Sequence, residues 1–303
     1  MAHTGMHRKS KNKHTSSSSY GRESAGEWDN IIRPHRKWWD INLRDLWRYR
    51  DLCMMYVKRN FITTYKQTIL GPLWFLIAPI FTIIIYMFIF GGLAGISTEG
   101  VPQPVFYMAG ILLWNYFTDC FGASSNVFVS NAHVFGKVWF PRLVLPISGC
   151  ITALGKSGIQ ALLFIGIYIF CIFYDAALHP NWTLVLVPVL IIMLSLHAMS
   201  WGLIVSSVSY KYRDIQVFIG FLLQLFMYMT PVVYPLETIP EKYKHVVMLN
   251  PLSSIFETFK YSCFNVGILD WWGLLYSLIF LIVVLTLSIL VFNRAEHTFM
   301  DTV

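Results

Sequence analysis

Charge is what this 303-residue chain has little of: Asp, Glu, Lys and Arg together make up 13% of the sequence. A soluble globular domain carries about 25%. Hydrophobic residues reach 56%, and they occur in long blocks. The scarcity of charge excludes an ordinary soluble globule. The blocks predict an integral membrane protein, because a helix of about 20 apolar residues crosses a bilayer.

Motifs for metal, disulfide and nucleotide chemistry are also missing. None of the five cysteines forms a CxxC pair, so we interpret them as small buried hydrophobes rather than metal ligands or disulfide partners. No phosphate-binding loop of the form GxxxxGK[ST] is present. We therefore expect no cofactor on this chain and no ATP bound by that route. Energy for uphill transport would come from a partner.

Charge within the apolar blocks is limited to Asp119 and Lys156. An ion-coupled transporter would show several buried acids or a proton relay, and an intramembrane enzyme would show clustered Asp, Glu or His. The expected helices place the two residues at similar depth, so we predict an intramembrane ion pair. A contact with substrate is the alternative.

Basic residues are concentrated near the N-terminus, where residues 1–69 hold 14 of the 23 Lys and Arg. Beside a membrane domain, such a cluster indicates the cytosolic face and contact with anionic membrane lipid rather than nucleic acid. Residues 1–37 are basic and rich in Ser, lack material for a core, and are predicted to be a disordered tail. No signal peptide is recognisable, so the first spanning helix would direct insertion.

Residues 38–69 are predicted to form an amphipathic helix at the membrane interface. Apolar side chains recur at roughly helical spacing over 41–68, and most basic side chains fall elsewhere around the helix. A solvated helix packed on the protein's own loops is the alternative. The residues assigned to the interface are Trp47, Arg48, Lys58 and Arg59.

Six later segments are long and apolar enough to span a membrane, which predicts an all-α transmembrane domain over residues 70–303. The spans are expected at 70–91, 105–129, 143–173, 182–209, 215–235 and 271–292. Lys and Arg alternate between the loops in a way that puts both chain ends in the cytosol. The outward loop 236–270 fits this alternation less well, because it carries three lysines.

The loop VFGKVWFPRLVLP (134–146) is apolar and rigid for a cytosolic connection. Its prolines would end one helix and begin the next, leaving a one- or two-turn helix near 131–138. Exposed aromatic side chains on such an element are typical of a docking site for another protein, and an aromatic belt in the lipid interface is the alternative. The candidate contact residues are Asn131, Phe135, Lys137, Val138, Trp139 and Arg142.

The loop 236–270 contains two stretches that are too short to cross, 239–249 and 251–264. Asn250 before Pro251 predicts a helix start, with Asn as the cap and Pro in the first turn. The two stretches would fit re-entrant helices that form an outer gate, or a simple extracellular cap. The candidate gate residues are Asn250, Pro251, Phe256 and Phe259.

Aromatic residues are abundant, with 23 Phe, 16 Tyr and 11 Trp. Aromatic faces suit sugar rings, so an aromatic lining would let a polysaccharide slide; packing against lipid or other rings is the alternative. The candidate pore aromatics are Tyr86, Phe90, Tyr107, Trp114, Phe117 and Tyr228.

Five stretches, in order along residues 38–300, resemble the permease subunits of ABC-type polysaccharide exporters, which export O-antigen, capsule or teichoic-acid chains attached to a lipid. They are YVKRNFITTYKQTILGPLWFLIAPI (56–80), KVWFPRLVLPIS (137–148), YKYRDI (210–215), TPVVYPLETIP (230–240) and LNPLSSIFETFKY (249–261). The tail before Trp38 matches no motif of that family.

The resemblance implies a homodimer of six-span subunits in the cytoplasmic (inner) membrane, with two separate ATPase subunits that bind ATP and Mg. It implies that residues near 131–138 are a coupling helix seated in the ATPase. Helix 38–69 would lie near the ATPase and the lipid-linked polysaccharide, and the pair within 236–264 would be outer gate helices. The expected function is a channel-forming permease and not an enzyme. A permease for a drug or small lipid, and a membrane enzyme acting on lipid-linked sugars, are the alternatives.

Overall fold

Helices are the only regular elements in the computed structural model, which describes residues 43–66, 68–135, 140–173, 178–209, 212 and 214–300. No strand occurs within those ranges, so the predicted all-α class is confirmed. The predicted tail, residues 1–37, lies outside them.

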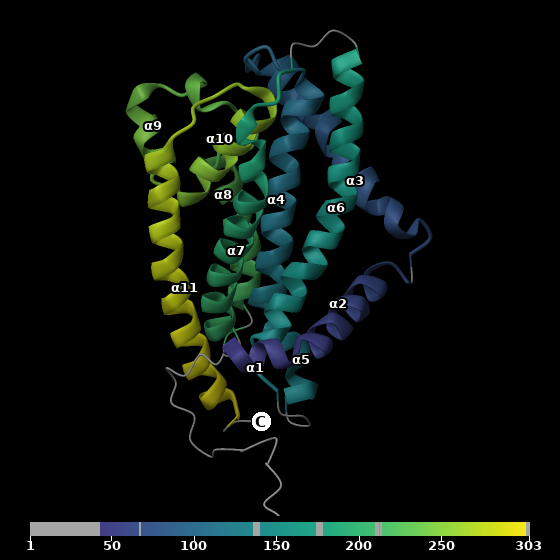
Figure 1. The fold of residues 1–303 in the computed structure, drawn as a ribbon, viewed down its shortest axis with the longest axis vertical. Coiled ribbons are helices and arrows are strands. Elements are labelled where there is room, and N and C mark those ends of the chain that lie inside the picture. Colours follow the sequence, from purple (N-terminus) through teal and green to yellow (C-terminus); the bar gives the residue numbers. More distant parts are fainter. Residues whose placement is uncertain are drawn as a thin grey trace, which may run out of the picture. The chain divides into compact units, whose positions relative to one another are not determined.

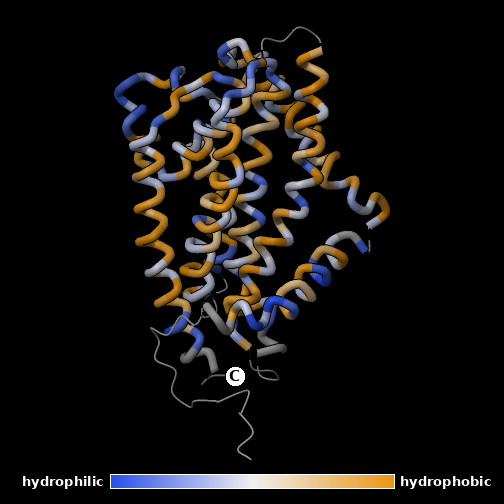
Figure 2. The backbone as a smooth tube through the Cα atoms, viewed as in Figure 1, coloured by the Kyte–Doolittle hydropathy of each residue, from blue (hydrophilic) through white to orange (hydrophobic). Residues whose placement is uncertain are grey.

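Four helical segments of the described chain are long and apolar enough to cross a membrane. They are Gly71–Leu93, Val144–Phe173, Trp182–Ser209 and Trp271–Glu296. The corresponding helices are α3 (Trp74–Tyr86), α6 (Val144–Phe173), α7 (Val187–Ser209) and α11 (Trp271–Met300). Helices α6, α7 and α11 run lengthwise through the bundle (Figure 1), and their middle portions are mainly hydrophobic (Figure 2). This is a membrane protein, and the four segments match four of the predicted spans.

Short irregular turns extend two of these helices. The turn η1 (Gly71–Leu73) precedes α3, and the π-helical η2 (Met87–Leu93) follows it. The turn η3 (Trp182–Leu186) precedes α7, with the Asn181 side chain accepting a hydrogen bond from the Trp182 backbone N–H as a helix cap. The flanking elements bring α3, which has 13 residues, to a spanning length of 23, whereas α7 is long enough by itself.

The other two predicted spans are also helical, as α4 (Gln103–Ser125) and α8 (Asp214–Met229). Helix α4 is long enough but less apolar, because its middle carries Asn115, Thr118 and Asp119. Helix α8 has 16 residues, fewer than the roughly 20 that a perpendicular crossing needs. The count of six spans therefore stays a prediction.

Helix α4 is the centre of the bundle and packs against both α6 and α7. Small residues let these helices approach closely. A Cβ atom added at Gly149 of α6 would lie 2.5 Å from the Ala123 Cβ of α4, and one added at Gly202 of α7 would lie 2.5 Å from the Ser124 Cβ. Being covered on several sides by protein, α4 can carry polar residues that a lipid-facing helix could not.

The predicted interfacial helix is two helices, α1 (Leu43–Arg48) and α2 (Arg50–Tyr65), which meet at Tyr49. Helix α2 packs on α6 through Cys53 and Tyr56, which are 8% and 6% exposed. Of the apolar residues expected to form one stripe, Trp47 and Met54 are 71% and 57% exposed. The packed face thus differs from the expected one, because apolar spacing in a membrane protein marks lipid-facing and protein-facing sides alike.

The two ends of the bundle carry different short helices (Figure 1). At one end, α5 (Val127–Phe135) follows α4 after Asn126, near α2. At the other end, η4 (Leu236–Thr238), α9 (Glu241–Met248) and α10 (Pro251–Phe264) follow α8. We refer to these as the α5 end and the α9 end. The predicted start of α10 is confirmed, because Asn250 Oδ1 accepts from the Leu252 backbone N–H at 3.0 Å and Pro251 is the first helical residue.

Candidate functional site

A line of polar side chains lies between α4 and α6. Asn115 and Asp119 are four residues apart on α4, and Lys156 and Gln160 are four apart on α6, so each pair shares a helix face. The Asn115 Nδ2 atom donates to Gln160 Oε1 at 3.3 Å, and Lys156 Nζ lies 3.8 Å from Asp119 Oδ2. We call these four residues the polar seam. It brings together the two residues that the sequence predicted as an ion pair.

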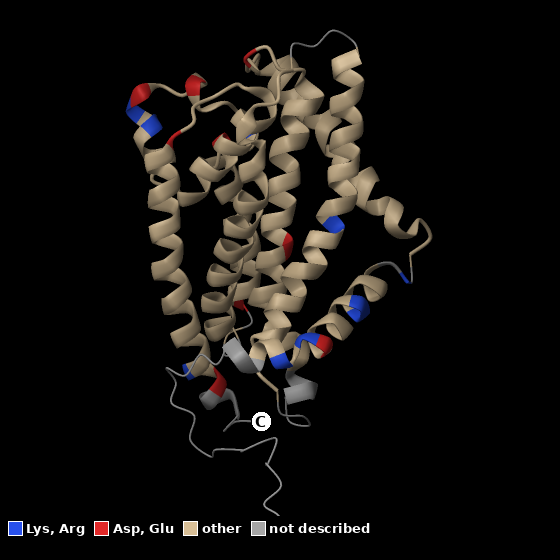
Figure 3. Cartoon of the chain, viewed as in Figure 1, with Lys and Arg blue, Asp and Glu red and all other residues tan. Residues whose placement is uncertain are grey.

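The seam is partly open. The Asp119 side chain is 42% exposed and the Lys156 side chain is 21% exposed, although both lie more than one turn inside their helices. Elsewhere, charged residues gather mainly toward the two ends of the bundle (Figure 3). Charge at membrane depth is costly and usually faces a cavity or polar partner. The seam is therefore a polar surface that the described part of the chain leaves partly uncovered.

A polar pocket lies beyond the seam, toward the α5 end. Gly122 and Asn126 follow Asp119 on α4 at intervals of three and four residues, so they extend the same face of that helix. The cavity volume is about 380 Å³. We call this cavity the base pocket. It is lined by Arg59, Asn60, Gly122, Ala123, Asn126, Val127, Ser130, Asn131, Leu145, Ser148 and Gly149.

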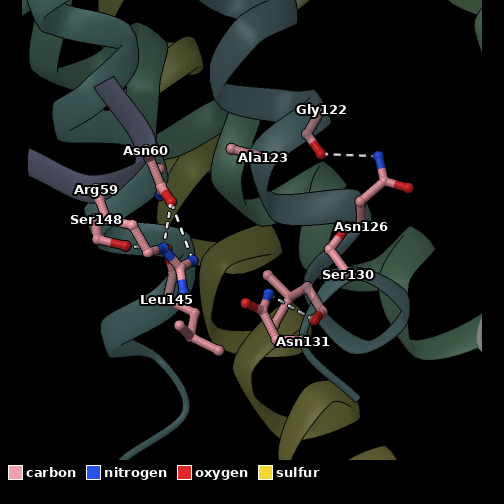
Figure 4. A pocket seen from close by; sticks show the side chains of 11 residues that line it. Arg59, Asn60, Gly122, Ala123, Asn126, Ser130, Asn131, Leu145 and Ser148 are labelled. Atoms are coloured by element: carbon pink, nitrogen blue, oxygen red, sulfur yellow. Dashed lines mark hydrogen bonds between the residues drawn. The ribbon is translucent and has the colours of Figure 1, made fainter. Parts of the chain in front are cut away.

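A single cation, Arg59 of α2, lines the base pocket, and none of its lining residues is acidic. The Asn60 Oδ1 atom accepts from Arg59 Nε at 3.3 Å and from Nη2 at 3.1 Å (Figure 4). The guanidinium carbon lies 4.4 Å from the centre of the Tyr56 ring, a cation–π contact. These neighbours orient the guanidinium without neutralising it, so the residues that line the pocket carry one positive charge and no negative charge.

The amide and hydroxyl groups of the base pocket are oriented by the helices that carry them. Asn126 Nδ2 donates to the Gly122 carbonyl at 3.0 Å, and Asn131 Nδ2 donates to the Val127 carbonyl at 3.0 Å (Figure 4). The Ser148 hydroxyl donates to the Leu145 carbonyl at 2.7 Å. The side-chain oxygens of these residues remain as acceptors for a ligand, and the second N–H of Asn131 remains as a donor.

The sequence pattern of the ABC-2 type transporter family matches residues 51–264, more than half of the chain. The matched range includes every residue of the polar seam and of the base pocket. The chain belongs to the ABC-2 type transporter family. The resemblance read from five sequence stretches is thereby confirmed.

Named relatives are similar to this ABC-2 chain over most of their length. The O-antigen export system permease protein RfbA of Klebsiella pneumoniae is 27% identical over 255 residues, which are 83% of this chain and 94% of the relative. The protein of the same name in Myxococcus xanthus is 27% identical over 223 residues, 72% of this chain and 82% of the relative. The polysialic acid transport protein KpsM of Escherichia coli is 24% identical over 250 residues, 80% of this chain and 93% of the relative.

Two of the residues predicted to contact an ATPase, Asn131 and Arg142, are described in full, and both lie at the α5 end of this ABC-2 chain. Asn131 lines the base pocket. Arg142 is 7% exposed, and its Nε lies 3.2 Å from Glu296 Oε1 of α11, so its side chain is held within the chain. Burial lowers the pKa of Arg142, and the Glu296 carboxylate opposes that shift. Lys137, Val138 and Trp139 lie outside the described residues, as does the side chain of Phe135.

The predicted interfacial residues are all exposed: Trp47, Arg48, Lys58 and Arg59. They separate into two groups in the structure. Arg59 reaches the base pocket, whereas Lys58, its neighbour in sequence, is not among the lining residues. The two cations carry the same charge and differ in what they face.

The predicted gate residues Asn250, Pro251, Phe256 and Phe259 are all buried, because α10 packs against α4, α7 and α11. Sequence reasoning missed their neighbour Lys260, which is 3% exposed. Its Nζ donates to the Pro231 carbonyl at 2.5 Å, to the Tyr234 carbonyl at 3.1 Å and to Glu257 Oε1 at 3.4 Å. The three-residue spacing of Glu257 and Lys260 on one helix was the available signal.

Most of the predicted pore aromatics pack within the chain. Tyr107, Trp114 and Phe117 of α4 are 0%, 7% and 2% exposed. Tyr86 and Phe90 form a cluster with Tyr107, with ring centres 5.4 to 6.5 Å apart. Tyr228 differs, being 49% exposed. Packing between rings, the alternative considered from the sequence, describes the first five, and a pore role stays a prediction.

The sequence analysis also missed most of the base pocket. Asn60, Asn126, Ser130 and Ser148 are polar residues near helix ends, where such residues are common. The regular intervals between Asn115, Asp119, Gly122 and Asn126 were the only signal that one polar face continues to the end of α4.

Proposed function

We propose that this chain is the membrane-spanning permease subunit of an ATP-driven exporter that moves lipid-linked polysaccharide across the cytoplasmic membrane. The observation that carries the proposal is the similarity to O-antigen and polysialic acid transport proteins over 93–94% of the length of two such relatives. Because the similarity covers nearly the whole length of these relatives, it extends over the helical bundle and is not limited to one segment.

The polar seam supports a hydrophilic cargo. Its partly exposed ion pair and its amide pair lie between α4 and α6, within a mainly apolar bundle. Sugar hydroxyls donate and accept hydrogen bonds, so such a surface offers them partners that lipid does not. A purely apolar cargo could not form hydrogen bonds with the polar seam.

The subunit is proposed to work as a homodimer with two ATPase subunits, which bind the ATP and Mg. The α5 end faces the cytosol in this proposal, because the first 69 residues hold 14 of 23 Lys and Arg. Residues from α5 onward then contact the ATPase, and movement of α5 passes to α11 through the Phe128–Phe292 stack, whose ring centres are 4.8 Å apart. The chain itself performs no chemistry.

The proposal is tested by deleting the gene, measuring surface polysaccharide, and purifying the tagged protein from gently solubilised membranes. We expect polymer to accumulate inside the deletion strain and an ATPase to co-purify in about equal amount. Normal surface polysaccharide together with a co-purifying ATPase would favour a permease for a drug or small lipid. A solitary protein in several detergents would contradict the ATP-driven exporter.

A further inference from the structure

We propose that the base pocket binds the lipid-proximal end of the cargo, a membrane-anchored glycosyl phosphate, with Arg59 on the phosphate and the pocket's oxygen atoms on the first sugar. This inference rests on the proposed function and adds to it a site, a ligand class and a division of roles among residues.

Arg59 has the free capacity to bind an anion. A guanidinium carries five N–H donors, and Asn60 engages two of them through one oxygen atom. Within the described residues, Arg59 has no acidic partner, and Tyr56 covers one face of the group without using a donor. A planar guanidinium with free donors matches the oxygen geometry of phosphate, and the strength of such charge-assisted hydrogen bonds exceeds that of neutral ones.

The rest of the pocket suits hydroxyl groups better than a second phosphate. Asn126 and Asn131 each donate an N–H to a helix carbonyl, which orients the amide and leaves its side-chain oxygen as an acceptor, and Asn131 keeps a second N–H as a donor. Ser148 likewise uses its hydroxyl hydrogen on a carbonyl. Sugar hydroxyls donate to such oxygens, whereas phosphate has no hydrogen to offer them and would be repelled. One cation beside several acceptors therefore selects an anion that carries a polyol.

The position and size of the pocket fit a ligand anchored in the membrane. Met55, one turn before Arg59 on α2, is 60% exposed and offers an apolar surface to a lipid chain. The volume of about 380 Å³ lies at the lower end of the roughly 300–1,000 Å³ typical of small-ligand sites. One phosphorylated sugar is a ligand of that class, and the rest of a polymer would lie outside, toward the polar seam.

The test measures lipid binding to the purified full-length protein in detergent by native mass spectrometry. The probes are a polyprenyl monophosphate carrying one hexose, the same lipid without the sugar, and phosphatidylglycerol. The variants are Arg59→Gln and the matched control Lys58→Gln, which removes the same charge one residue away and outside the pocket. Asn131→Ala tests the sugar contact. Arg59→Lys keeps the positive charge but removes the planar set of guanidinium N–H donors.

We expect Arg59→Gln to weaken binding of both polyprenyl phosphate lipids by about tenfold or more, while Lys58→Gln changes it by less than about threefold. Arg59→Lys should fall between them. Asn131→Ala should weaken binding of the hexose-bearing lipid by about threefold and leave the bare lipid unchanged. Thermal unfolding of each variant checks that the fold is retained.

Equal losses in Arg59→Gln and Lys58→Gln would overturn the site in favour of diffuse surface charge. An equal loss of phosphatidylglycerol binding in Arg59→Gln would show that the pocket binds bulk lipid headgroups instead of cargo. If the wild type bound the lipid with and without the hexose equally well, the proposed sugar contact would be contradicted. Any of these results alongside lost export in the deletion strain contradicts the pocket alone. Unaffected export in that strain contradicts the proposed function.

Discussion

At the scale of single residues, Lys260 shows how local packing can stabilise a charge that is buried in the bundle. Its ammonium group is surrounded by two backbone carbonyls, the Glu257 carboxylate and the face of the Phe106 ring, 4.5 Å away. The carbonyls belong to the turn that follows α8, so this one side chain ties α10 to that turn. A buried charge with a full set of partners is stable, and a buried charge without them is not.

Replacing Lys260 with Met should therefore destabilise the protein by about 3 kcal/mol or more, because Glu257, 5% exposed, would keep a buried charge with no cation. The double variant Lys260→Met/Glu257→Gln should recover part of the loss. Lys242→Met, at an exposed position on α9, is the control and should change little. Thermal unfolding in detergent measures the stability of all three variants. Equal losses of stability in Lys260→Met and Lys242→Met would contradict a stabilising role for the contacts of Lys260.

Glu99, in the loop between η2 and α4, gives a pH dependence whose sign can be derived. Burial raises the pKa of Glu99, and the charges of Glu237 and Glu257 raise it further, with Lys260 opposing. A folded pKa above the unfolded value means that the folded state binds more protons between the two values. This stabilising contribution is complete below the unfolded pKa, about 4.3, and is lost as pH rises through the folded pKa.

In Glu99→Gln the side chain cannot ionise, so the variant does not lose stability as pH rises. Its melting temperature should therefore exceed that of the wild type at pH 8, and the difference should shrink toward pH 4. Glu241→Gln, at an exposed position on α9, serves as the control. Thermal scans at the two pH values decide the matter. A wild-type-to-variant difference that is constant with pH would show that charge on Glu99 is not the cause.

At the scale of helices, α4 and α6 are joined in two different ways. Near the α5 end, Gly149 and Ala123 bring the backbones together by small size, and midway along the helices the polar seam joins them by an ion pair and an amide pair. The ion pair is long, at 3.8 Å, and partly exposed, so solvent screening limits its contribution to stability.

Asp119→Ala and Lys156→Ala should each destabilise the protein, and the double variant should lose less than the sum. We expect a coupling energy of about 0.5–1 kcal/mol from the double-mutant cycle, measured by unfolding in detergent. Asn115→Ala combined with Lys156→Ala is a control, because those two residues are not paired in the structure. Additive losses for Asp119 and Lys156 would mean that the pair contributes nothing.

At the scale of the whole molecule, the α5 end is where several elements meet. Helices α2, α4, α5 and α6 line the base pocket, and Arg142 and Phe128 both contact α11 through Glu296 and Phe292. A partner that displaced α5 would therefore move the pocket and α11 together. This arrangement is suited to transmitting a movement from outside the bundle into it.

The residues expected to receive that movement, Phe135 and Trp139, were proposed from the sequence, and their side chains lie outside the described residues. Replacing both with Glu should uncouple ATP hydrolysis from transport while the protein still folds. Hydrolysis by the purified complex and export by the cell are measured in parallel. Normal export in the double variant would contradict the coupling assignment.

The sequence by itself determined the class of protein, because the length and apolarity of a spanning helix are local properties. It also determined the start of α10, since the cap at Asn250 depends on neighbours in the chain. The loop after the fifth expected span was rightly expected to hold two short helices, although their depth in the membrane stays a prediction.

Only the tertiary structure decided which residues the helices bring together. Apolar residues in a membrane protein face both lipid and protein, so spacing did not reveal that Tyr56 packs while Met54 is exposed, or that Tyr107 is buried. Lys260 was read as part of an outward loop, because nothing in the chain nearby shows the carbonyls that surround it. The base pocket depends on Arg59 from one helix and on asparagines from two others, and only their packing places them around one cavity.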